Sequence, residues 1–311
     1  MDLLYVALGI ALLYGGGEAL VRGSVSLARS SGLSPLVVGL TVVSFGTSSP
    51  ELASTLAAAL RGSPEVAFGN VVGSNLANIG LILGLTGLIW PMSTTATFIR
   101  REMPFLLLAS GSLFWLVVDD RVSRVEGAAL LVLLILFLVY LFRREANGSG
   151  DAAGEVATAE YRPQPIARSV LLVVLGVALL TLGGNALVTG AVGIARAVGV
   201  SERVIGLTVV ALGTSLPELA SSLVAARERH GDLVLGNLIG SNIFNVLCIL
   251  GATALIHPVQ VASHEVWVDL VVMLAMSALV WPFLATRLEL QRWEGAMLLS
   301  GYGLYLLFLF S

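Results

Sequence analysis

Residues 39–56 read GLTVVSFGTSSPELASTL, and residues 206–223 read GLTVVALGTSLPELASSL. Fourteen of these 18 positions are identical at a constant offset of 167 residues. Without a gap, the same offset places the stretch 69–78, GNVVGSNLAN, on 236–245, GNLIGSNIFN. A match of this extent within one chain indicates an internal duplication that covers most of each half.

Composition shows which solvent surrounds the duplicated chain. Of its 311 residues, 57% are hydrophobic and only 12% are charged, and the mean hydropathy is +0.93. A water-soluble domain needs less apolar material to fill its core, so these values indicate a bilayer protein. Runs of about 20 apolar residues are long enough to cross the hydrocarbon. The sequence offers ten, with approximate bounds 2–21, 35–60, 65–89, 103–118, 122–142, 168–188, 203–226, 231–256, 265–284 and 293–310.

The duplication and the ten runs together predict the topology. Each copy holds five runs, and because five is odd, the second copy enters the membrane from the opposite side. We therefore expect an all-α integral membrane protein of ten transmembrane helices, built as two five-helix inverted-topology repeats. The first repeat is residues 1–142 and the second is residues 167–311. Residues 143–166 are polar and rich in Gly and Ala, which is typical of a linker.

Arginine placement predicts the orientation, because all 17 basic residues are arginines. With the N-terminus outside, twelve arginines lie on the inner side and five on the outer side. The positive-inside rule thus favours extracellular termini and a cytoplasmic linker in a cell-membrane protein. A net charge of −3 and the lack of a basic patch give no reason to expect a nucleic-acid partner.

Two glutamates in the middle of apolar runs carry the strongest chemical signal. Glu51 and Glu218 each follow a proline in the repeated pattern GTS-x-PE. An unpaired charge in the bilayer costs roughly 3 kcal/mol, and no lysine is present to neutralise these two. Proline also removes an amide donor, which is expected to free the carbonyl groups of Gly46 and Gly213. A bound cation or a proton is the simplest partner for such a site.

The available ligand atoms indicate which cation would bind. Hydroxyls, carboxylates and carbonyls are hard oxygen donors that suit Na⁺ and Ca²⁺. Two bidentate carboxylates and two freed carbonyls supply about six oxygens, close to the roughly six to eight that Ca²⁺ prefers. Two negative charges balance one divalent or two monovalent cations, which gives a physical basis for exclusive occupancy.

A second repeated pattern, GN-x-x-GSN-x-x-N, adds neutral polar groups. Ser74 and Asn78 are four residues apart and share one helix face, as do Ser241 and Asn245. We expect these faces to contribute to the cation site, with interhelical hydrogen bonds alone as the alternative. On the first apolar run, Glu18 and Arg22 are one turn apart and are expected to form a local ion pair.

With both patterns doubled, the sequence resembles the calcium/cation antiporter superfamily, specifically prokaryotic members of its sodium/calcium exchanger family. The resemblance implies that helices 2, 3, 7 and 8 form an ion-binding core across which helices 1 and 6 slide. It also implies a set of site residues, with the two glutamates as the main Ca²⁺ ligands. This set comprises Glu51, Glu218, Thr47, Ser48, Thr214, Ser215, the carbonyls of Ser44 and Ala211, and Ser74, Asn78, Ser241 and Asn245.

The same resemblance implies a transporter with no enzymatic activity and no cofactor, whose substrates are Ca²⁺ and Na⁺ and which functions as a monomer. One departure concerns Asn78 and Asn245, because members of the family commonly carry aspartate at one of these positions. It leaves the stoichiometry and the potassium dependence open. Ca²⁺/H⁺ antiport through the same glutamates is the alternative, and a passive cation channel is a more distant one.

Overall fold

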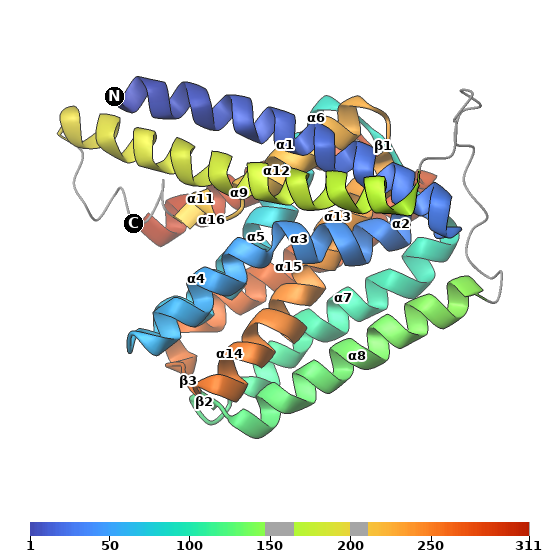
Figure 1. Ribbon diagram of the computed structural model, residues 1–311. Coiled ribbons are helices and arrows are strands. Elements are labelled where there is room, and N and C mark those ends of the chain that lie inside the picture. Colours follow the sequence, from blue (N-terminus) through green and yellow to red (C-terminus); the bar gives the residue numbers. More distant parts are fainter. Residues whose placement is uncertain (147–164, 200–210, 311) are drawn as a thin grey trace.

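Long helices dominate the computed structural model, which describes residues 1–146, 165–199 and 211–310 (Figure 1). Within these ranges, six helices are long and apolar enough to cross a bilayer, and the bent pair Pro35–Thr47 and Ser49–Leu60 makes a seventh candidate. The chain is thus a helical membrane protein with six or more apolar helices. Most of the predicted linker (147–164) and the start of the predicted span 203–226 (203–210) lie outside the described residues.

Corresponding elements recur in the two halves. Those of the first half are α1 (Asp2–Ser31), α2 (Pro35–Val38), π-helix η1 (Gly39–Val43), α3 (Ser44–Thr47), α4 (Ser49–Leu60), α5 (Pro64–Leu76), π-helix η2 (Ala77–Leu83), α6 (Gly84–Ile89), α7 (Ala96–Leu116) and α8 (Arg124–Ala146). Those described in the second half are α9 (Ile166–Ala197), α11 (Ala211–Gly213), α12 (Leu216–Arg227), α13 (Gly231–Phe244), π-helix η4 (Asn245–Leu250), α14 (Gly251–Ile256), α15 (Ser263–Arg287) and α16 (Arg292–Phe310). Helices α4 and α12 begin 167 residues apart, as do α5 and α13, so the sequence offset is also a structural one.

Several helices continue beyond the predicted apolar runs. Helix α1 extends past residue 21 and ends at Ser31, where Gly32 adopts a left-handed φ of 72°. Helix α8 continues to Ala146, so the first four residues of the predicted linker are helical. Arginine, glutamate and alanine are good helix formers. Hydropathy therefore marks the part of a helix that crosses lipid and not the point at which the helix ends.

Helices α1 and α9 lie side by side and run antiparallel across one side of the bundle (Figure 1). Glycines make this approach possible in a reciprocal way. A Cβ atom on Gly16 would lie 2.8 Å from the backbone nitrogen of Leu180, and one on Gly183 would lie 2.8 Å from that of Leu13. The predicted Glu18–Arg22 ion pair on α1 is confirmed, with 3.3 Å between the charged atoms.

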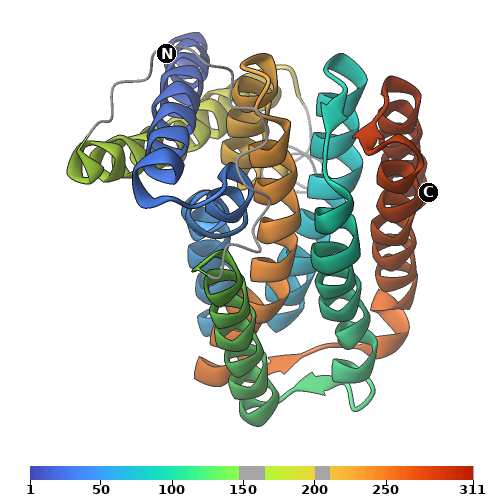
Figure 2. The same ribbon diagram turned by 90° about the vertical axis from the view of Figure 1, so that its right-hand side faces the viewer.

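Two short β-ribbons connect the halves at opposite ends of the bundle (Figure 2). Strand β1 (Met92–Ser93) pairs antiparallel with β4 (Glu289–Leu290), and β2 (Arg121–Val122) pairs antiparallel with β3 (Val259–Gln260). Each ribbon thus takes one strand from each half of the chain. Exchanging the halves exchanges the ribbons, as expected for elements related by a pseudo-two-fold axis.

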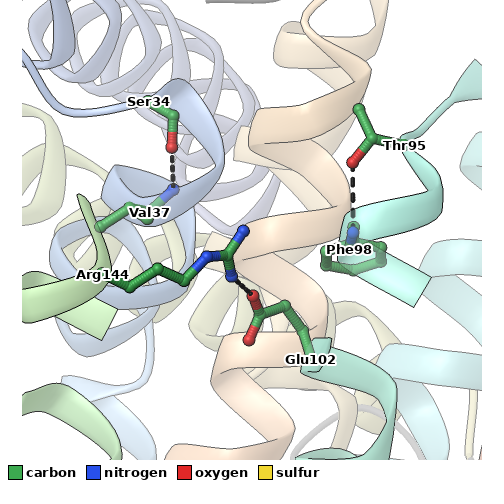
Figure 3. Close-up of polar contacts among 6 residues, drawn as sticks. All are labelled: Ser34, Val37, Thr95, Phe98, Glu102 and Arg144. Carbon is green, nitrogen blue, oxygen red and sulfur yellow. Dashed lines mark hydrogen bonds and ion pairs between the residues drawn. The ribbon is translucent and has the colours of Figure 1, made fainter. Parts of the chain in front are cut away.

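Side-chain caps start helices α2 and α7, and a buried ion pair joins α7 to the last turn of α8 (Figure 3). The hydroxyl oxygen of Thr95 accepts a hydrogen bond from the amide of Phe98 over 3.2 Å. This cap starts α7 at Ala96, seven residues before the predicted run 103–118. The early start brings Glu102 into the helix, where its carboxylate pairs with the guanidinium of Arg144 on α8. Both side chains are largely buried, with 1% and 10% of their surfaces exposed.

Candidate ion-binding site

The repeated GTS-x-PE segments are breaks between helices. The axis bends by 44° between Pro35–Thr47 and Ser49–Leu60, and Ser48 at the break has φ −83° and ψ 3°. Ser215 occupies the equivalent break before α12, with φ −92° and ψ 5°. Both prolines therefore stand in the first turn of a new helix, where the missing amide is tolerated, and not inside a continuous helix. The predicted run 35–60 consists of several helical pieces with a bend at Ser48.

Each break places its glutamate in the protein interior, in contact with the other half. Glu51 and Glu218 are 2% and 0% exposed. The hydroxyl of Ser48 donates to Oε1 of Glu218 over 3.0 Å, and the hydroxyl of Ser215 donates to Oε1 of Glu51 over 3.3 Å. Serine and glutamate at both breaks therefore exchange hydrogen bonds reciprocally across the two halves.

A ladder of asparagine amides continues this reciprocal arrangement. Asn78 lies in η2 and donates to Oδ1 of Asn242 over 3.0 Å. Asn245 begins η4 and donates to Oδ1 of Asn75 over the same distance. All four asparagines are buried. The π-helical turns change the register of their helices at this level, a feature that is common at functional sites.

Six buried oxygens of the predicted site residues have no hydrogen-bond partner among the described residues. They are Oε2 of Glu51, Oε2 of Glu218, Oδ1 of Asn78, Oδ1 of Asn245, Oγ of Ser241 and Oγ1 of Thr214. Leaving a buried polar atom unpaired costs about 1–3 kcal/mol, and more for a charged group. All six are hard oxygen donors, the type of ligand that Na⁺ and Ca²⁺ prefer.

The remaining predicted residues lie on the short helices that precede these breaks and on α5, which precedes η2. The carbonyl of Ser44 accepts from the amide of Ser48 over 2.9 Å and from the hydroxyl of Thr47 over 3.5 Å. The hydroxyl of Ser44 donates to the backbone carbonyl of Asn237 over 2.9 Å. Ser74 is buried in α5, and Ala211 is the first residue of α11.

Sequence reasoning missed Asn75, Asn242 and Asn237 as members of this network. Asn75 and Asn242 are the partners of the predicted Asn78 and Asn245. Asn237 accepts a hydrogen bond from the hydroxyl of Thr47 over 3.3 Å. All three belong to the duplicated pattern GN-x-x-GSN-x-x-N. A fuller use of that signal would have included every asparagine that recurs at an offset of 167.

Comparison with known proteins agrees with this architecture. The sequence profile of the family described as "Sodium/calcium exchanger protein" matches residues 1–143 and 168–311. The chain belongs to the sodium/calcium exchanger family. The sodium/calcium exchanger MaX1 of Methanosarcina acetivorans is 34% identical over all of this chain and 99% of its own length. The putative antiporter CaxA of Alkalimonas amylolytica is 38% identical over 99% of this chain and 98% of its own length.

Solved structures extend the family relationship to the fold. The sodium-calcium exchanger NCX_Mj, soaked with zero Na⁺ and Ca²⁺, matches with a TM-score of 0.85 and 33% identity. The match covers 99% of this chain and 98% of that one. Among the sequence relatives, the inner membrane protein YrbG of Escherichia coli is 36% identical over 97% of this chain and 94% of its own length. A member of this exchanger family is a multi-pass membrane transporter, and cation exchange is the activity that the family supports.

Proposed function

We propose that this exchanger moves Ca²⁺ against Na⁺ by secondary active antiport with alternating access. The observation that carries the proposal is the set of six buried oxygens, two of them from Glu51 and Glu218, that both halves contribute and that have no hydrogen-bond partner within residues 1–146, 165–199 and 211–310. One Ca²⁺ neutralises the two carboxylates at a single site, whereas Na⁺ ions do so only in greater number. Mutually exclusive occupancy then couples the two fluxes.

The proposed ligands are the twelve residues expected from the sequence. Glu51 and Glu218 hold the divalent cation, and each keeps one carboxylate oxygen free for it. The hydroxyls of Thr47, Ser48, Thr214 and Ser215 assist Na⁺ binding beside them. Ser74, Asn78, Ser241 and Asn245 line the middle of the site, and the carbonyls of Ser44 and Ala211 face it.

The proposed topology is ten transmembrane helices in two five-helix inverted repeats, residues 1–142 and 167–311. Residues 143–166 form a cytoplasmic linker, and both termini lie outside the cell. The reciprocal ribbons at opposite ends of the bundle support this arrangement, as does the antiparallel pair α1 and α9. A working unit of one chain completes the proposal, because both halves of the site come from the same chain.

Radiolabelled calcium uptake tests the proposal. Proteoliposomes loaded with Na⁺ are diluted into Na⁺-free buffer, and a parallel set carries a pH gradient in place of the Na⁺ gradient. Uptake driven by the outward Na⁺ gradient alone is the expected result. Uptake that requires the pH gradient would move the protein to Ca²⁺/H⁺ antiport with the same glutamates. Uptake without any counter-ion gradient would indicate a channel, and no uptake in any arm would refute calcium as the substrate.

A further inference from the structure

One contact in the site breaks the reciprocity that the others obey. The hydroxyl of Thr47 in the first half donates to Oδ1 of Asn237 in the second half over 3.3 Å. The equivalent residues at the 167-residue offset are Thr214 and Asn70. Thr214 Oγ1 has no hydrogen-bond partner in the part of the chain that the structure describes. Of these two threonines, only Thr47 is held by an asparagine of the opposite half.

Asn70 is engaged within its own half. Its Nδ2 donates to Oγ1 of Thr55 over 2.7 Å and to Oγ of Ser54 over 3.2 Å, both on α4. This arrangement turns the amide toward the neighbouring helix and leaves Thr214 without it. The amide of Asn70 is therefore seen bonded to its own half, whereas Asn237 also accepts a hydrogen bond from Thr47 of the other half.

Asn237 is only weakly engaged within its own half. The equivalents of Ser54 and Thr55 are Ser221 and Ser222 on α12. Asn237 Nδ2 contacts Ser221 Oγ only at 3.4 Å, and the buried Ser222 Oγ has no partner among the described residues. A cavity of about 10 Å³ lies beside Ser221, Ser222 and Asn237. This volume is about that of one water-sized sphere, so packing beside the Asn237 amide is locally incomplete.

We propose that Asn70 and Asn237 form a two-position switch that holds one site threonine at a time. In the state seen here, Asn237 accepts a hydrogen bond from Thr47 while Asn70 donates one to Thr55. In the opposite access state, Asn70 accepts a hydrogen bond from Thr214 while Asn237 donates one to Ser222. The switch rests on the proposed alternating-access function and adds two positioning residues that stand outside the ligand set.

Inverted repeats give the physical reason for this exchange of roles. The two access states of such a transporter are related by swapping the conformations of its repeats. A contact made by one repeat in the first state is therefore made by the other repeat in the second. Both states of the switch contain one cross-repeat bond and equivalent bonds within the repeats, so their free energies stay close and cations can shift the population.

Two single variants test the switch by the sign of their effects, because each of these two residues makes its contact in one state only. Thr55→Ala removes a contact of the present state, so it favours the opposite state. Ser222→Ala removes a contact of the opposite state, so it favours the present one. Thr55 and Ser222 lie outside the proposed ligand set, and the two serve as repeat-matched controls for each other.

The measurement is the Na⁺ concentration that half-saturates exchange, determined at each membrane face in right-side-out and inverted vesicles. The apparent affinity for Na⁺ at a face decreases when a smaller fraction of the transporters is open to that face. The ratio of the two values therefore reports the population of the access states and is insensitive to a general loss of affinity. A neutral hydrogen bond is expected to change this ratio roughly two- to tenfold.

The expected result is that Thr55→Ala shifts the ratio in one direction and Ser222→Ala shifts it in the other. A shift of both in the same direction, or a ratio equal to wild type in both, would overturn the switch. If wild-type vesicles show no Na⁺-dependent calcium flux, the proposed function fails separately. Half-saturating Ca²⁺ at the two faces then tests the switch by the same signs.

Discussion

The hydroxyl of Ser48 donates a hydrogen bond to Oε1 of Glu218 over 3.0 Å, so the first half of the chain orients a carboxylate of the second. Ser215 does the same for Glu51. Both bonds leave Oε2 of the glutamate without a partner among the described residues. The serines thus fix one oxygen of each carboxylate and direct the other toward the proposed cation.

Replacing either serine by alanine is expected to weaken Ca²⁺ binding. A hydrogen bond to a charged group contributes about 1.5–3 kcal/mol, so Ser48→Ala and Ser215→Ala should raise half-saturating Ca²⁺ roughly tenfold or more. Ser49→Ala is the matched control, because the Ser49 hydroxyl donates to the carbonyl of Phe45 at the exposed side of the same turn. Calcium uptake at graded Ca²⁺ concentrations measures all three, and equal effects of Ser48→Ala and Ser49→Ala would contradict the assigned role.

Neutralising either glutamate is expected to abolish transport. Glu51→Gln and Glu218→Gln keep the side-chain volume but remove one of the two charges that balance a divalent cation. The loss of Ca²⁺ affinity should exceed the roughly 10- to 100-fold loss that follows when a residue that only orients a metal ligand is replaced. Glu18→Gln is the control, because Glu18 pairs locally with Arg22 on α1. Isothermal titration with Ca²⁺ and uptake assays report the two effects, and full calcium flux in both variants would refute the site.

The sequence was sufficient to predict the duplication, the family and the two buried glutamates, because each depends on a pattern repeated at one offset. It did not lead to a prediction of the helix break at Ser48, although the polar stretch GTSSPE within 35–60 contains the glycine and proline that often interrupt helices. It also gave no signal for the π-helical turns that begin at Ala77 and Asn245. Those turns depend on packing between helices, which a linear pattern does not contain.

The sequence also did not indicate which hydrogen-bond partners the asparagines of the site take. The duplicated pattern places Asn70 and Asn237 at equivalent positions, yet one contacts Thr55 and the other Thr47. Similar sequence neighbourhoods therefore make different contacts, as expected where the two halves of an inverted-repeat protein differ in conformation.

The buried pair of Glu102 and Arg144 is expected to behave as a coupled unit in stability. Removing one partner of such a pair leaves a charge uncompensated and costs about 3–5 kcal/mol. We expect Glu102→Gln and Arg144→Gln each to lower the melting temperature in detergent, and the double variant to lower it by much less than the sum. Additive effects in this double-mutant cycle would show that the two side chains do not depend on each other.

Asp120 is expected to make stability depend on acid pH at the end of α7. Hydrogen bonds from the Ser263 hydroxyl and then from its backbone amide lower the pKa of Asp120 below its ordinary value. The amide donates to Oδ1 over 2.8 Å. A carboxyl whose pKa is lowered by folding stabilises the folded state above its unfolded pKa of about 3.9. That contribution disappears as pH falls through the lower, folded pKa.

The test compares wild type with Asp120→Asn, which keeps a side chain suited to the left-handed φ of 57° but does not titrate. Melting temperatures in detergent are measured from about pH 6 to about pH 3. The advantage of wild type over the variant should decrease toward the acid end, because protonation removes the charge that the Ser263 donors favour. Other carboxylates titrate alike in both proteins and cancel in the difference. A difference that stays constant over this range would show that the Asp120 charge contributes nothing to the folded state.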